Sequence, residues 1–183
     1  MEMNTVSIGV LVSGNGSNFQ AIADAIDAGR IPGARIVCFI TNRPEAYALE
    51  RARKNNIPAF VLNHKDYPDR RAYDEALVAL LKENNVKLVV LAGFMRLLSE
   101  VMINAFPNAI MNIHPALLPS FPGVDAQRQA LEYGVRFTGC TVHFVDCGTD
   151  TGPIIIQSVV PVLGDDTIES LSERIHGEEH RIY

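Results

Sequence analysis

The sequence has few cysteines, and their spacing suggests no structural framework. Only Cys38, Cys140 and Cys147 occur in 183 residues. Disulfide-stapled domains and zinc sites use more cysteines, or cysteines placed much closer together. A reducing compartment is the simplest setting for such a chain, so we expect a cytoplasmic protein.

Long apolar runs and an excess of positive charge are missing as well. No run reaches the ~18 residues of a membrane-spanning helix, and Met1–Thr5 has no signal-peptide character. The formal net charge of -5 at pH 7 argues against a general binder of nucleic acid or membrane surfaces. We therefore expect neither partner.

The apolar residues that are present form short runs separated by helical patterns. The chain is 48% hydrophobic and 20% charged, which suits one globular domain over residues 1–183. The alternation predicts a Rossmann-like, mostly parallel sheet with helices on both faces, and an antiparallel strand pair near the C-terminus. The predicted strands are Val6–Val12, Ala34–Thr41, Ala59–Leu62, Lys87–Ala92, Ala109–His114, Arg136–Val145 and Ile154–Val160.

Two helix starts are predicted from local signals. Pro44 is typical of a first helical turn. Asp166-Thr-Ile-Glu169 resembles a capping box that opens the last helix.

A glycine-rich loop, Ser13–Asn18, lies between the first strand and the first helix. Backbone N–H groups and the helix dipole both face such a loop, so it can bind an anion; the alternative is merely a tight turn. The loop is no dinucleotide fingerprint, because the pattern that starts at Gly14 lacks its third glycine. Hydride transfer with NAD is therefore a poor interpretation.

Polar residues also follow later strands. Arg96 comes just after Lys87–Ala92, at the sheet edge where ligands bind in α/β folds, although it would also suit a plain surface charge. Asn112 and His114 alternate along one strand and so share a face. An amide and an imidazole there are a suitable pair for stabilising an oxyanion and moving a proton; the alternative is a satisfied core histidine beside a turn asparagine.

Several motifs along the whole chain resemble the folate-dependent formyltransferase family of phosphoribosylglycinamide formyltransferases. They occur in the family's order and spacing: Ser13–Asn18, Leu91–Arg96, Asn112–Pro119, Val142–Val145, Asp150–Pro153 and Glu179-His180. The chain departs from the family at Ala116, Asp125 and Gln127, and it lacks the family's C-terminal tail after Tyr183.

The resemblance implies transfer of a formyl group from 10-formyltetrahydrofolate to glycinamide ribonucleotide in purine synthesis, with no metal. It assigns catalysis to Asn112, His114 and Asp150, which assists proton transfer. It implies ribonucleotide binding by Asn15, Gly16, Ser17, Asn18 and Glu179, and folate binding by Arg96, Leu97, Leu98 and Val145. His143 is either a supporting residue or simply packs on the sheet. A homodimer stays open.

Other activities are compatible with parts of this pattern. A formyltetrahydrofolate hydrolase and a methionyl-tRNA formyltransferase use the same folate motif, but both usually carry additional domains. A catalytically silent module that binds folate or phosphate is the remaining alternative. The anion loop favours the ribonucleotide as acceptor.

Overall fold

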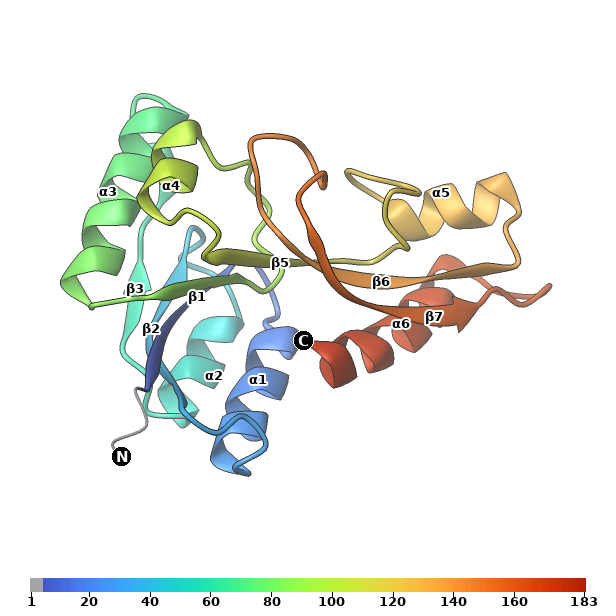
Figure 1. Ribbon diagram of the computed structural model, residues 1–183, viewed down its shortest axis with the longest axis horizontal. Coiled ribbons are helices and arrows are strands. Elements are labelled where there is room, and N and C mark those ends of the chain that lie inside the picture. The colour runs from blue at the N-terminus through green and yellow to red at the C-terminus, as the bar shows by residue number, and fades with distance from the viewer. Residues whose placement is uncertain (1–4) are drawn as a thin grey trace. The chain divides into compact units, whose positions relative to one another are not determined.

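The computed structural model describes residues 5–183. Of Met1–Thr5, which the sequence predicts to be no signal peptide, residues 1–4 lie outside the described part. The described residues form a seven-stranded sheet in the order β3-β2-β1-β4-β5-β6-β7 (Figure 1). The chain divides into two compact units, Met1–Met111 and Asn112–Tyr183, and the division falls inside β5, Ile110–His114. The predicted α/β fold class is confirmed.

The first unit alternates strands and helices. Strand β1 pairs in parallel with both β2 and β4, and β2 pairs in parallel with β3. Helices α1 and α2 lie on one side of these strands, and α3 and α4 on the other (Figure 1). The elements are β1 Val6–Val12, α1 Ser17–Asp27, β2 Ala34–Thr41, α2 Ala48–Lys54, β3 Ala59–Val61, a 3₁₀ turn His64–Asp66, α3 Arg70–Glu83, β4 Leu88–Leu91 and α4 Glu100–Ala105.

Burial on both faces explains why β1 carries no polar side chain from Ile8 to Val12. Val10, Leu11 and Val12 are almost fully buried although they alternate faces, as a covered parallel sheet requires. Gly9 completes the fit, because a Cβ there would lie only 2.7 Å from the Leu81 side chain of α3. Because Gly9 has no side chain, α3 can pack closely on β1.

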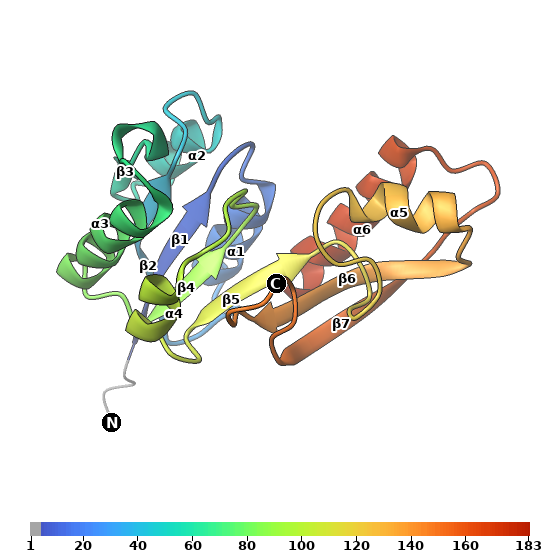
Figure 2. The ribbon, with the colours of Figure 1, turned by 90° about the horizontal axis from the view of Figure 1, so that it is seen from above.

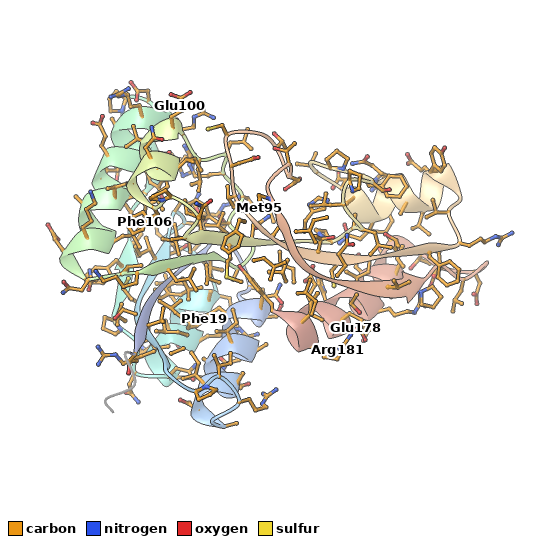
Figure 3. All side chains as sticks on the ribbon, in the orientation of Figure 1. Phe19, Met95, Glu100, Phe106, Glu178 and Arg181 are labelled. Carbon is orange, nitrogen blue, oxygen red and sulfur yellow. The ribbon has the colours of Figure 1, made fainter. Side chains whose placement is uncertain are left out.

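The second unit is built on an antiparallel pair. It contains the end of β5, then α5 Ala126–Tyr133, β6 Phe137–Phe144, β7 Ile154–Pro161 and α6 Ile168–Ile182. The predicted antiparallel pairing of β6 with β7 is confirmed. Helix α6 lies against β6 and β7 and next to α5 (Figure 2). Arg181 joins α6 to β7, since it donates to the Ser158 hydroxyl at 2.9 Å. It also donates to Glu178 of its own helix at 2.6 Å (Figure 3).

One predicted helix start was wrong, and the other was displaced by one residue. Ala46 N–H donates to the Arg43 carbonyl at 3.1 Å, so Pro44 occupies a turn and α2 begins only at Ala48. The fixed φ of proline suits that turn position as well as a first helical turn. The capping box of α6 is formed by Thr167 and Ser170, one residue later than predicted.

Candidate functional site

Strand β5 is mostly apolar but contains two polar side chains, Asn112 and His114. Asn112 and His114 alternate with buried Ile113, so they leave the same face of the strand. His114 is 4% exposed, whereas Asn112 is half-buried. The sequence therefore places an imidazole in a nearly dry setting, where its hydrogen-bond partners decide what it can do.

Both ring nitrogens of His114 face acceptors. Nε2 lies 2.8 Å from the Phe121 carbonyl, which can only accept, so Nε2 carries a proton and donates it. Nδ1 lies 3.3 Å from Oδ2 of Asp150. A proton on Nδ1 would turn that contact into a charge-assisted hydrogen bond, so this geometry suits an imidazolium beside a carboxylate.

Asp150 is held in place by backbone geometry. Its φ is 55°, in the left-handed region that few non-glycine residues occupy. Its Oδ2 accepts from the Gly123 N–H at 2.8 Å. In the same loop, Oδ1 of Asp146 accepts from Gly148 N–H at 3.0 Å and from the Thr151 hydroxyl at 2.6 Å. The Gly123 N–H thus orients the Asp150 carboxylate, and the hydrogen bonds of Asp146 shape the loop that carries it.

His143, on β6, joins Asn112 to the same cluster. Its Nδ1 lies 2.9 Å from the Phe144 carbonyl and donates to it. Burial lowers the pKa of His143, which keeps the ring neutral and leaves Nε2 as an acceptor. Nε2 lies 3.2 Å from the amide nitrogen of Asn112 and 3.6 Å from Oδ1 of Asp150. Asn112 therefore donates one N–H to His143, and its orientation is set by that bond.

A hollow of about 230 Å³ opens beside Asp150. One of its lining residues, Leu118, is held by Thr141 of β6, whose hydroxyl accepts from Leu118 N–H at 3.1 Å and donates to the Ala116 carbonyl at 2.7 Å. The lining comes from two loops and the first residue of β7: Leu118, Pro119, Pro122, Thr149, Asp150, Thr151, Gly152 and Ile154. Such a lining with one carboxylate suits an organic ligand with few polar groups.

In the first unit, the predicted anion loop ends at the start of α1. Gly16 is the N-cap residue, with φ 75° and no side-chain capping bond. The first N–H groups of a helix have no partner within the helix, and a glycine cap does not cover them. Ser17 and Asn18 open α1 and are half-buried. The loop therefore has the local form that anion binding needs.

A chain of side chains links the strand ends of this unit, and the sequence analysis missed it. The Ser13 hydroxyl donates to Oδ1 of Asn42 at 2.6 Å and accepts from Met95 N–H at 2.8 Å. The Asn42 amide nitrogen lies 3.3 Å from Nδ1 of His64. Ser13 and Asn42 directly follow the parallel strands β1 and β2, a signal that could have placed them together at one edge.

The folate-binding residues predicted in the first unit, Arg96, Leu97 and Leu98, lie in the loop between β4 and α4. Leu97 is well exposed and Leu98 is half-buried. The neighbouring Met95, labelled in Figure 3, is also well exposed. The Arg96 guanidinium stacks over the Tyr73 ring at 4.9 Å. This stacking gives Arg96 a structural anchor, so it is not simply a solvated surface charge.

The remaining predicted residues lie in the second unit. Glu179 on α6 is 4% exposed, and its Oε2 lies 4.0 Å from Nε2 of His176. Val145 is half-buried at the end of β6. The structure thus brings Asn112, His114 and Asp150 together, and adds His143 to them.

The described residues offer neither a metal site nor a membrane-spanning helix. No group of three or more His, Cys, Asp or Glu side chains in residues 5–183 is placed to hold a metal ion. Over the same range, no helix is both long and apolar enough to cross a membrane.

Comparisons with known proteins support the resemblance predicted from the motifs. The model of the family described as Formyl transferase matches residues 6–183. The chain is 43% identical to the phosphoribosylglycinamide formyltransferase of Bacillus subtilis over 95% of this chain and 89% of that protein. It is 48% identical to the trifunctional purine biosynthetic protein adenosine-3 of Drosophila melanogaster over 94% of this chain, but it spans only 13% of that protein.

A solved structure is similar over nearly the whole chain. Glycinamide ribonucleotide transformylase 1 from Symbiobacterium toebii has a TM-score of 0.96 and 54% sequence identity, covering 98% of this chain and 84% of that one. At this identity, the likeness extends beyond the fold to the family.

Proposed function

The chain belongs to the formyl transferase family, and from this premise we propose that it transfers a formyl group from 10-formyltetrahydrofolate to the amine of glycinamide ribonucleotide. The observation that carries the proposal is the Asn112–His114–Asp150 cluster beside an apolar hollow. The cluster combines hydrogen-bond donors with a proton relay, and neither nucleophilic catalysis nor a metal is needed for this exchange.

The reaction moves one carbon between two nitrogens. The amine nitrogen of the ribonucleotide forms a bond to the formyl carbon, and the carbonyl electrons move onto oxygen. The bond from that carbon to the folate nitrogen then breaks, and the folate nitrogen gains the proton that the amine loses. The step therefore needs stabilisation of an oxyanion and a path for one proton.

Asn112 is suited to the oxyanion. His143 takes one of its amide hydrogens, which fixes the plane of the amide and directs the other hydrogen to the reacting oxygen. Preorganised donors of this kind are worth roughly 10²–10³ in rate when they contact only the transition state.

His114 and Asp150 are suited to the proton. In the structure Nε2 of His114 donates to Phe121, so it must exchange this carbonyl for the oxyanion or the substrate during the reaction. Asp150 balances the charge of the imidazolium and orients a water that carries the proton between the two nitrogens.

We propose a cytoplasmic setting and small-molecule substrates. All three cysteines are free thiols, which agrees with a reducing compartment. We propose the loop Asn15–Asn18 and Glu179 as the ribonucleotide contacts, and Arg96, Leu97, Leu98 and Val145 as the folate contacts.

A transfer assay tests the proposal. The protein is mixed with 10-formyltetrahydrofolate and glycinamide ribonucleotide, and mass spectrometry follows the acceptor. We expect one formyl group per ribonucleotide, and a much higher KM for the dephosphorylated nucleoside. Release of formate without the acceptor would instead indicate a hydrolase, and binding with no turnover would indicate a silent module.

A further inference from the structure

The start of α2 shapes the anion loop. Ala48 N–H donates to the Gly14 carbonyl at 3.2 Å. A Cβ on Gly16 would lie 2.6 Å from the Cβ of Ala48, so this close approach needs glycine at position 16. Only a glycine with its φ of 75° lets the loop turn against α2 in this way. Contacts with Ala48 of α2 therefore help to set the conformation of the loop.

One side chain of α2 binds the loop directly. Nε of Arg51 donates to the Asn15 carbonyl at 2.9 Å, and Nη2 donates to Oδ1 of the same residue at 2.8 Å. The guanidinium also lies over the Tyr47 ring, 5.2 Å from its centre. The planar fork thus binds both acceptors of one residue, and the aromatic ring keeps the fork in position.

This clamp changes what Asn15 offers to a ligand. An unclamped asparagine at the loop surface can present either its oxygen or its amide group. With Oδ1 bound to Arg51, the amide hydrogens point away from the guanidinium, so the residue presents donors. An acceptor close to a phosphate would repel it, whereas donors and a nearby positive charge attract it.

We propose that Arg51 is a positioning residue that makes the loop Asn15–Asn18 selective for a phosphate group. This inference rests on the proposed function for the identity of the phosphate's carrier, the ribonucleotide. It adds a residue outside the loop to the determinants of phosphate recognition.

Helix α2 offers a matched control. Arg53 lies two residues further along, is well exposed, and donates to Glu50 at 2.8 Å. Arg53→Gln removes the same charge from the same helix without touching the loop. Any effect of net charge alone must therefore appear in both variants.

The kinetic test compares Arg51→Gln, Arg51→Lys and Arg53→Gln. For Arg51→Gln we expect the KM for the ribonucleotide to rise roughly tenfold to hundredfold, with kcat and the KM for folate nearly unchanged. Arg51→Lys keeps the charge but loses the fork, so its KM for the ribonucleotide should rise nearly as much as that of Arg51→Gln. An Arg51→Lys variant equal to the unmodified protein would overturn positioning, as would equal effects in Arg51→Gln and Arg53→Gln.

A binding test does not depend on formyl transfer. Inorganic phosphate is titrated into the protein while the amide NMR signals of Asn15 and Gly16 are followed. Saturable shifts in the unmodified protein and in Arg53→Gln, lost in Arg51→Gln, support the inference even if no formyl transfer occurs. Equal shifts in all proteins, or none in the unmodified protein, overturn it. Unfolding curves of the two glutamine variants should agree, which separates loop geometry from general destabilisation.

Discussion

The polar sites of the two units consist of different chemical groups. In residues 5–111 the proposed anion loop would bind through backbone N–H groups, and its shape is set by Gly16 and by side chains from neighbouring elements. In residues 112–183 the cluster relies on titratable side chains, each oriented by a backbone carbonyl or N–H group. The first arrangement suits holding a charge that does not change, and the second suits moving a proton. Substitutions should therefore separate binding from turnover.

The largest expected effect is on turnover. His114→Ala removes the group that faces both Asp150 and the Phe121 carbonyl. We expect kcat to fall by roughly 10²–10⁴, the range for loss of a general acid–base group, with ribonucleotide affinity nearly unchanged. Steady-state kinetics and equilibrium binding measure the two quantities separately. Near-normal turnover would remove His114 from the proposed mechanism.

A smaller loss is expected when the support of Asn112 is removed. His143→Phe fills the space but offers no acceptor to the Asn112 amide. We expect kcat to fall about tenfold to hundredfold while both KM values stay within a few-fold. His143→Gln, which restores an acceptor, should recover part of the rate. If glutamine and phenylalanine gave equal rates, His143 would act by packing alone.

Side chains with distinctive chemistry were the predictable part of the site. Asn112, His114 and Asp150 were assigned from motifs, and the structure brings them together. The left-handed φ of Asp150 was not predicted, because few non-glycine residues adopt that conformation. The clamp of Arg51 on Asn15 joins residues 36 positions apart, and nothing in either segment alone points to the other.

Strands were predicted better than helix starts, for a physical reason. Strand β1 has the predicted bounds, and from Ile8 to Val12 burial leaves little choice of residue. At α6 the predicted cap was Asp166, whereas the structure uses Thr167. Asp166 is taken instead by Arg174, which binds both of its oxygens at 2.8 Å. Competition for one side chain by a residue eight positions away decides the helix start.

The polar chain of the first unit should matter for stability more than for chemistry. Ser13→Ala leaves the buried Oδ1 of Asn42 without its donor. We expect a loss of about 1–3 kcal/mol in the free energy of unfolding, measured by urea denaturation. A double-mutant cycle with Asn42→Ala should show coupling between the two. Strictly additive losses would mean that the bond contributes nothing.

In the second unit, Asp166 should contribute to the free energy of unfolding in a way that depends on pH. The Arg174 guanidinium beside Asp166 holds the pKa of that carboxyl well below its usual range. Because the unfolded chain binds the proton more tightly, this stabilisation is present above about pH 4 and is lost as the pH falls towards the folded pKa. Asp166→Asn should cost about 1 kcal/mol near pH 7, and the difference from the unmodified protein should shrink below pH 4. Urea titrations at several pH values measure it, and a constant difference would contradict the assignment.

The smallest expected effect is the difference between the two units in the urea concentration at which they unfold. We expect no difference. Each contains one buried thiol, and burial raises the pKa of Cys38 to about 11 and that of Cys140 to about 12. Neither thiol should react at neutral pH until its surroundings open. Because the division of the chain falls within β5, neither unit can lose that strand alone, and we expect one cooperative domain. In a Cys147→Ser background, which removes the exposed thiol, both cysteines should become labelled at the same urea concentration in pulsed alkylation read by mass spectrometry. Labelling of one thiol at clearly lower urea would show that the two units unfold independently, and that the prediction of a single domain over residues 1–183 is wrong.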